Sequence, residues 1–281
     1  MIKLIAMDLD GTLLNHAGKI SKFTHHVLQM AHQANIQLVI CSGRPYEAAE
    51  EVLHSLQFKE KKGIYIGMNG QMIHIFHQNK VIEKPSLQQH HIQEILNHAD
   101  NALVSAVIYD KNRYIISAPR KNMWIAYVFS YLQKCSWIFR QNDNFQERIL
   151  IPFNQIQLKS TGKICFCSLP STLKKIEKKL SSDLYSCVYV SPIWMECQHK
   201  EISKGAALEF ICEMYHISTE EVLAFGDGEN DLSMLNYAGT GVAMKNAMKS
   251  VKQAADDICP SNQQDGVAKY LYHYLKKKAE S

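Results

Sequence analysis

The sequence has no apolar run long enough to cross a membrane and no low-complexity segment in its 281 residues. It also lacks the layout of a secretory signal peptide, because its first apolar run is short and ends at the charged residue Asp8. The charged fraction of 21% does not suggest disorder. These absences lead us to expect a folded, cytoplasmic protein that has no membrane partner.

The cysteines lack any known metal or redox spacing. The chain has 8 of them, and none belongs to a CxxC pair or to a zinc-binding pattern. Several lie inside apolar runs, as Cys41 and Cys165 do, which is typical of small buried side chains in a reducing compartment. We therefore expect the cysteine side chains to pack in the protein core and not to bind metal or undergo redox chemistry.

The charges are close to balance. The chain carries 31 basic and 27 acidic residues, and its formal net charge is +4. This excess suits an anionic substrate but is far below that of a usual nucleic-acid-binding protein, so we expect no nucleic-acid partner. The hydrophobic content of 46% is enough for one large domain or for two modest ones.

The two ends of the chain alternate between strand and helix patterns. Short apolar runs at residues 2–7, 36–41, 64–68, 222–225 and 241–244 are typical of strands buried on both faces. Ser21 and Ser203 are expected to cap helices, and Pro45 fits the first position of another. Apolar residues recur at helical spacing after each of them and again at residues 267–275. This alternation predicts an α/β fold with a Rossmann-like parallel sheet that is flanked by helices.

The middle of the chain has a different pattern. Residues 103–117 and 185–197 resemble two hairpins, and helical patterns lie between them. We interpret residues 85–195 as a separate α+β domain with an open antiparallel sheet, inserted into an α/β core that comprises residues 1–84 and 196–281. The aromatic residues of its first long helix and the following segment are expected in the core of this domain, and the lining of a pocket is the alternative: Trp124, Tyr127, Tyr131 and Trp137.

Two carboxylates, Asp8 and Asp10, directly follow the first predicted strand. Paired carboxylates at a buried strand end are costly unless a hard cation compensates them. Gly11 lets the chain turn and leaves backbone N–H groups to face an anion. Asp8 is placed to attack phosphorus and Asp10 to act as acid and base. The alternative interpretation is an Asp-Gly turn that closes the strand.

Two further segments suggest a phosphate site. Ser42 and Gly43 lie between a strand and a helix that begins near Pro45, and helix N-termini bind phosphate. A simple helix cap by Ser42 explains that segment equally well. Lys204 occupies a first helical turn, where the helix dipole disfavours a cation unless the side chain reaches an anion. An exposed surface lysine is the alternative.

An acidic loop, Gly226-Asp227-Gly228-Glu229-Asn230-Asp231, follows a late strand. Three carboxylates and an amide at one strand end suit a magnesium site that retains waters. An acidic loop with a helix cap is the alternative. Because ligands bind at the carboxyl edge of an open α/β sheet, these segments are expected to converge on one site.

Taken together, the four segments resemble the ordered motifs of the haloacid dehalogenase superfamily of phosphatases: Asp8-Leu9-Asp10-Gly11-Thr12, Ser42-Gly43-Arg44, Lys204-Gly205 and Gly226-Asp227-Gly228-Glu229-Asn230-Asp231. Residues 241–247 after the fourth motif resemble the Cof-type branch. The inserted middle matches the large cap of that branch in place and size. The charged segment before Lys204, residues 197–202, departs from the Pro/Gly-containing linker expected there.

The resemblance implies a role for each motif residue. Asp8 is the expected nucleophile and Asp10 the general acid/base. The expected Mg²⁺ ligands are Asp8, Asp10 through its carbonyl, Asp227 and Asp231. The residues expected to bind phosphate are Leu9, Gly11, Thr12, Ser42, Gly43, Lys204 and Asn230.

The implied activity is magnesium-dependent hydrolysis of small phosphomonoesters through an aspartyl-phosphate. Sugar phosphates are the expected substrate class, and pyridoxal phosphate and flavin mononucleotide are the alternative substrates. A phosphomutase and a non-catalytic sensor of phosphorylated metabolites are the alternatives, and a monomer or a homodimer is expected.

Overall fold

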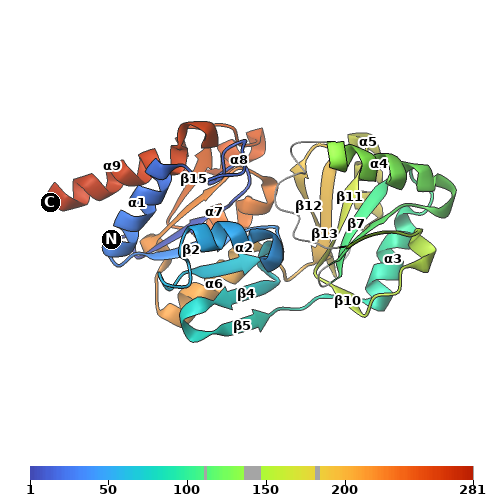
Figure 1. Ribbon diagram of the computed structural model, residues 1–281, viewed down its shortest axis with the longest axis horizontal. Coiled ribbons are helices and arrows are strands. Elements are labelled where there is room, and N and C mark those ends of the chain that lie inside the picture. Colours follow the sequence, from blue (N-terminus) through green and yellow to red (C-terminus); the bar gives the residue numbers. More distant parts are fainter. Residues whose placement is uncertain (111–112, 136–146, 181–183, 281) are drawn as a thin grey trace. The chain divides into compact units, whose positions relative to one another are not determined.

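The computed structural model of the protein describes residues 1–110, 113–135, 147–180 and 184–280 (Figure 1). The chain forms two compact units. One contains Met1–Lys84 and Ser203–Ser281, and the other contains Pro85–Ile202. We call them the core unit and the inserted unit.

The core unit is built on an eight-stranded sheet with the order β16-β15-β14-β1-β2-β3-β4-β5 (Figure 1). Its strands are β1 (Leu4–Met7), β2 (Gln37–Cys41), β3 (Ile64–Gly67), β4 (Met72–Ile75), β5 (Lys80–Glu83), β14 (Val222–Gly226), β15 (Thr240–Met244) and β16 (Asp257–Cys259). The five strands that the sequence predicted are present within a residue or two. These five strands run parallel to one another, as strands joined by helical crossovers do.

The edge of the core sheet differs from the prediction. β4 and β5 are antiparallel additions to β3 and form a meander that the sequence analysis did not predict. In β4 only alternate residues, Ile73 and Ile75, are buried. Its apolar pattern is therefore much weaker than that of β3, whose four residues are all buried.

Helices flank the core sheet: α1 (Lys22–Gln33), α2 (Tyr46–Ser55), α6 (Lys204–Tyr215), α7 (Leu232–Tyr237), α8 (Lys249–Ala254) and α9 (Gly266–Glu280). Two of the predicted helix caps are confirmed. Ser21 accepts a hydrogen bond from the Thr24 N–H, and Ser203 accepts one from the Ala206 N–H. Pro45 is the residue just before α2 and not its first helical residue.

The inserted unit contains a six-stranded sheet with the order β12-β13-β11-β7-β8-β9. Its strands are β7 (Ser105–Asp110), β8 (Arg113–Ser117), β9 (Glu147–Leu150), β11 (Lys163–Cys167), β12 (Tyr185–Ser191) and β13 (Trp194–His199), and β6 (Leu87–Gln88) pairs with β10 (Ser160–Thr161). Both predicted hairpins are present. The sheet is not wholly antiparallel, however, because β8 and β9 run parallel.

The second boundary between the units lies after Ile202 and not after Met195 as the sequence suggested. β13 pairs with β12 as far as His199, so cutting the chain after Met195 would divide a strand of the inserted sheet. Strand pairing over several residues is a tertiary contact that the local pattern did not reveal.

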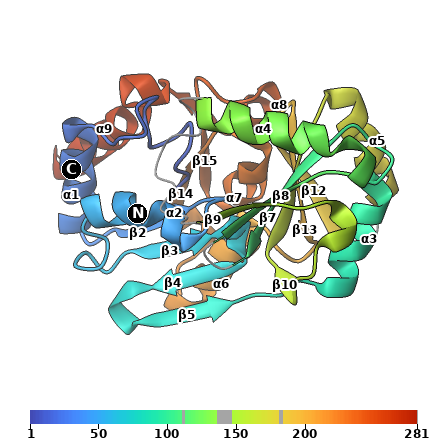
Figure 2. The same ribbon diagram turned by 45° about the vertical axis from the view of Figure 1, so that its right-hand side comes forward.

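Two helices of the inserted unit are α3 (Gln89–Ala99) and α5 (Pro170–Leu180), which are labelled in Figure 2. Both contribute buried apolar residues to its main core. Ile164 and Phe166 of β11 belong to the same core. The intervening residues of β11 point to the opposite sheet face. There Lys163 Nζ donates to Glu196 Oε1 at 2.5 Å, and both side chains are buried. The second face therefore carries a buried ion pair.

The aromatic residues of helix α4 (Met123–Cys135) do not lie where the sequence analysis placed them. Trp124, Tyr127 and Tyr131 are exposed, so they are not part of the core of the inserted unit. Ala126 and Phe129 face the sheet instead, next to Ile116. Trp137 lies outside the described residues.

Within the described residues, no helix is both long enough and apolar enough to cross a lipid bilayer.

Candidate active site

Three neighbouring parallel strands end at the residues that the motifs predicted. Asp8 follows β1, Ser42 follows β2 and Asp227 follows β14, and β1 lies between the other two strands. Because parallel strands end at the same edge of a sheet, the first, second and fourth motifs meet at the carboxyl edge of the core sheet.

Lys204 is the first residue of α6. Although it lies far from Asp8 in the sequence, its side chain reaches Asp8 at this edge of the sheet. Its side chain is fully buried, and its Nζ donates to Asp8 Oδ1 at 2.6 Å and to Asp231 Oδ1 at 2.5 Å. A β-carbon on Gly205 would lie 2.3 Å from the Ser233 carbonyl oxygen, so glycine lets α6 begin close to α7. The alternative of an exposed surface lysine is wrong.

The acidic loop after β14 folds around Asp231. Its Oδ2 accepts from the N–H groups of Asp227 at 2.8 Å and of Gly228 at 3.0 Å. Thr12, which was predicted to bind phosphate, donates its hydroxyl to Asp227 Oδ1 at 3.0 Å. These contacts bring carboxylate oxygens of Asp8, Asp227 and Asp231 within 4.8 Å of one another.

Burial and repulsion from neighbouring carboxylates raise the pKa values of Asp8 and Asp227. Burial is the main reason that the pKa of Asp8 is well above its usual value, and it acts against the favourable charge of Lys204. Burial, followed by repulsion from Asp231, raises the pKa of Asp227 to about 7. Burial alone would lower the pKa of Lys204, but the charges of Asp231 and Asp8 outweigh it and keep the ammonium ionised. The cluster therefore favours additional positive charge.

Asp10 has different surroundings from Asp8, although only Leu9 separates them. Its carboxylate is paired through both oxygens with Arg44, with Arg44 Nε 2.7 Å from Asp10 Oδ2 and Nη2 bonded to Oδ1. The Asp10 side chain is 54% exposed, whereas Asp8 is buried. The structure thus places one carboxylate of the first motif in the acidic cluster and the other at the surface.

The loop after β2 is held by backbone contacts. The hydroxyl of Ser42 accepts from the Arg44 N–H at 3.1 Å, and the Ser42 carbonyl accepts from the Asn69 N–H at 3.0 Å. The Arg44 carbonyl accepts from the Tyr65 hydroxyl at 2.7 Å and from the Met68 N–H at 3.0 Å. Ser42 is fully buried and Gly43 is half-buried in the turn that these bonds shape.

The residues that follow β3 adopt an uncommon backbone. Met68, Asn69 and Gly70 all have positive φ angles, of 51°, 57° and 111°. A non-glycine residue in this region carries backbone strain, which is often retained near functional sites. Here the strained turn supplies the N–H groups that bind the loop after β2.

Gly11 is a position where only glycine fits. Its φ is +80°, and a β-carbon there would lie 2.2 Å from Asp227 Oδ2. Its carbonyl accepts from the Asn246 side chain at 2.7 Å. Leu9 is buried beneath this turn. The turn and the acidic loop are therefore fitted to each other.

Three residues at this edge were given no role by the sequence analysis. Arg44 binds Asp10, Asn69 accepts from the predicted phosphate ligand Asn230 at 3.2 Å, and Asn246 binds Gly11. A signal for them was available. Asn69 and Asn246 follow strands of the same parallel sheet, and Arg44 was part of the second motif, so a search of every strand end would have found them.

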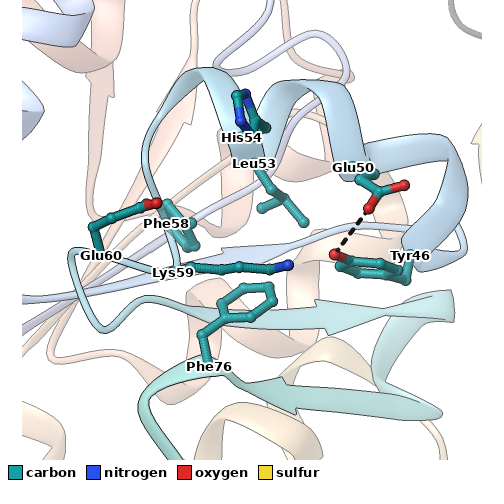
Figure 3. Close-up of a pocket in the computed structure, with 8 residues that line it drawn as sticks. All are labelled: Tyr46, Glu50, Leu53, His54, Phe58, Lys59, Glu60 and Phe76. Atoms are coloured by element: carbon teal, nitrogen blue, oxygen red, sulfur yellow. Dashed lines mark hydrogen bonds between the residues drawn. The ribbon is translucent and has the colours of Figure 1, made fainter. Parts of the chain in front are cut away.

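A small pocket beside α2 is too small to be the substrate site (Figure 3). It encloses ≈ 40 Å³, whereas ligand sites are usually several hundred Å³. Figure 3 shows the Tyr46 hydroxyl pointing at Glu50, with Phe58 and Phe76 on the other walls. The strand-end cluster remains the candidate active site.

Comparison with known proteins identifies the family. The family model for haloacid dehalogenase-like hydrolases matches residues 5–271. The chain belongs to this family, which confirms the resemblance seen in the four motifs, and it is therefore an enzyme of hydrolase type.

Individual relatives match along their whole length. The chain is 29% identical to the putative phosphatase YxeH of Bacillus subtilis, over 99% of this chain and 100% of the relative. It is 28% identical to the 5-amino-6-(5-phospho-D-ribitylamino)uracil phosphatase YcsE of the same species, over 98% and 96%. A crystal structure of a haloacid dehalogenase-like hydrolase from Bacteroides thetaiotaomicron superposes with a TM-score of 0.77 at 29% identity, covering 98% and 100%.

Replacing Lys204 by methionine should strongly destabilise the core unit. Asp8 and Asp231 would then be buried without their cation, and breaking a buried pair costs about 3–5 kcal/mol. Denaturant unfolding of the metal-free protein measures the loss. The exposed Lys269→Met is the matched control and should change stability by less than about 0.5 kcal/mol. Equal effects of the two substitutions would show that Lys204 does not hold the site together.

Proposed function

We propose that the protein is a magnesium-dependent phosphatase that hydrolyses small phosphomonoesters through an aspartyl-phosphate at Asp8. The observation that carries this proposal is the position of Asp8. Its carboxylate is buried at the end of β1, is fixed by Lys204 at 2.6 Å, and lies among the oxygens of Asp227 and Asp231. A preorganised carboxylate beside compensating positive charge is what attack on a phosphate dianion requires.

The reaction has two displacements at phosphorus. In the first, an oxygen of Asp8 forms a bond to phosphorus, the bond to the alkoxide oxygen breaks, and Asp10 gives that oxygen a proton. In the second, Asp10 takes a proton from water, whose oxygen attacks phosphorus and releases phosphate from Asp8. Lys204 stays bonded to Asp8 and balances the charge that gathers on the phosphoryl oxygens.

Arg44 orients the acid/base. Its guanidinium holds both oxygens of Asp10, while its Nη1 donates to the Ala48 carbonyl at 3.2 Å. The backbone bonds from Tyr65 and Met68 hold the Arg44 main chain. Because a bidentate pair fixes the direction of a carboxylate, Arg44 turns Asp10 away from the acidic cluster and toward the exposed side.

The acidic cluster fits Mg²⁺. Hard divalent cations prefer carboxylate oxygens, and Lys204 supplies one positive charge against three carboxylates. Asp8, Asp227 and Asp231 would hold the ion, and Asp10 would contribute through its carbonyl because its side chain is paired with Arg44. When bound, the ion would neutralise phosphoryl charge and lower the pKa of the carboxylates around it, as Lys204 does for Asp8.

We assign the inserted unit, residues 85–202, the role of a cap that restricts access to small substrates. Two observations on relatives support this class of substrate. YcsE is named for a phosphorylated ribityl compound, and the relatives match the full chain, inserted unit included. A sugar phosphate or similar polyhydroxylated phosphomonoester is the substrate class that we propose.

Asp8→Asn should remove the hydrolysis of p-nitrophenyl phosphate, by on the order of 10⁴-fold or more, because an amide cannot attack phosphorus. Acid-quenched wild-type enzyme should carry labelled phosphate from substrate, and the variant should carry none. Asp100→Asn, an exposed carboxylate of the inserted unit, is the control and should retain full activity. Turnover that persists in Asp8→Asn would exclude Asp8 as the nucleophile.

Asp10→Asn should lower kcat by about 10²–10⁴-fold and cause the aspartyl-phosphate to accumulate, because water is no longer deprotonated. Arg44→Gln should also lower kcat with little change in KM. Arg44→Lys should be intermediate, because lysine keeps the charge without the bidentate geometry. The exposed Arg120→Gln is the control. If Arg44→Gln changes KM alone, Arg44 binds substrate and does not orient Asp10.

Mg²⁺ should raise the thermal unfolding temperature of the protein, and chelation should abolish hydrolysis reversibly. Ligand present at 100 times its dissociation constant stabilises a folded state by about 2.7 kcal/mol. Asp227→Asn should weaken the stabilisation by Mg²⁺, because it removes a carboxylate of the cluster. Asp100→Asn again serves as the control. Full activity with excess chelator would contradict the metal assignment.

An isomerised phosphorylated product without phosphate release would favour a phosphomutase.

A further inference from the structure

The first ten residues of helix α4 of the inserted unit, 123–132, are apolar except for Ser130. From Met123 to Gln133 the helix contains no charged residue and no histidine. Its inner face packs on the sheet, where Ala126 is buried next to Ile116, and the Phe129 ring lies tilted against Trp194 with 6.0 Å between ring centroids. A helix that is hydrophobic all round is normally covered all round.

The outer face of α4 is not covered by the described residues of the inserted unit. Five large apolar residues recur at helical spacing along it and are 48–67% exposed: Trp124, Tyr127, Val128, Tyr131 and Leu132. We call them the α4 stripe. Their spacing of three and four residues places them on one side of the helix, so they form a continuous surface and not scattered exposed residues.

The size of the α4 stripe is that of one side of a small interface. A buried aromatic side chain covers about 150–250 Å², so three rings exposed by more than half, with Val128 and Leu132, offer on the order of 500 Å². Two such surfaces in contact would bury about 1,000 Å² in total, which is near the lower limit for a specific protein interface. A partner that brings an equal apolar surface is therefore needed.

We propose that the α4 stripe is a homodimer interface, in which two copies of the protein pair α4 with α4 in antiparallel fashion about a twofold axis. The stripe spans about 12 Å along the helix. With the axis at Val128, Trp124 of each copy lies over Leu132 of the other, and the tyrosines fill the spaces beside the axis. Such a contact is self-complementary, as a twofold interface must be.

The composition of the α4 stripe favours a protein partner over a lipid surface. Tyrosine and tryptophan are enriched in protein interfaces, and charged residues are depleted at their centres. A helix that lies on a membrane needs a basic polar face opposite its apolar one. α4 lacks such a face, because the side opposite the stripe is packed against the sheet. A second copy supplies a matching stripe without any further component.

Sedimentation velocity on the full chain tests this directly. From about 1 to 200 μM the wild type should shift from monomer to dimer, because an interface near the lower size limit is of the weak, transient kind. Val128→Glu and Val128→Lys should each remain monomeric, because they place like charges next to each other across the axis. An equimolar mixture of the two should recover the dimer, because opposite charges then meet.

The control is Ile258→Glu, a substitution at a 50% exposed residue of β16 in the core unit, which should dimerise as the wild type does. Circular dichroism verifies that each variant is folded. A wild type that stays monomeric throughout overturns the proposal, as does a dimer that both Val128 variants retain. A mixture that stays monomeric overturns the twofold pairing. Co-sedimentation of monomeric wild type with phosphatidylcholine–phosphatidylserine vesicles, abolished by Val128→Glu, would assign the stripe to a membrane instead.

Discussion

The contact of Lys204 with Asp8 and Asp231 is the interaction on which the site depends. It joins the end of β1, the start of α6 and the loop after β14, and 196 residues separate Lys204 from Asp8 in the chain. Buried ions are costly to desolvate, so the three groups are stable there only together. The same cost means that a further positive charge would stabilise the cluster, which is the basis of the proposed Mg²⁺ site.

Asp8 and Asp10 are only two positions apart in the sequence, but their side chains have different surroundings. Asp8 is buried beside the Lys204 ammonium group, whereas Asp10 is half-exposed and paired with the Arg44 guanidinium. The sharp turn at Gly11 makes this separation possible, because its left-handed backbone lets the chain pass close to Asp227. The proposed nucleophile and the proposed acid/base therefore lie in one five-residue segment but in different surroundings.

The inserted unit shows a similar division between its two sheet faces. One face is apolar and packs against α3 and α5, and the other carries the buried pair of Lys163 and Glu196. Cys165 and Trp194 also donate to Glu196 Oε1, at 3.6 Å and 3.4 Å. Replacing such a pair by apolar residues can be neutral, but losing one partner is costly, so the network specifies how β11 and β13 align.

Much of the core fold and of the candidate site could be predicted from the sequence. Apolar runs located β1, β2, β3, β14 and β15, and since parallel strands end at one edge, the strand ends already indicated that Asp8, Ser42 and Asp227 meet. Ser21 and Ser203 were identifiable as caps because capping is a local interaction. The rest depends on contacts between distant segments.

Only the tertiary structure decided that Lys204 is buried between two aspartates and that Arg44 binds Asp10. It also decided that β13 belongs to the inserted sheet, and that Trp124, Tyr127 and Tyr131 face outward. The physical reason is the same in each case. Composition and spacing show which side of an element is apolar, but which surface covers that side is settled by packing between elements far apart in the chain.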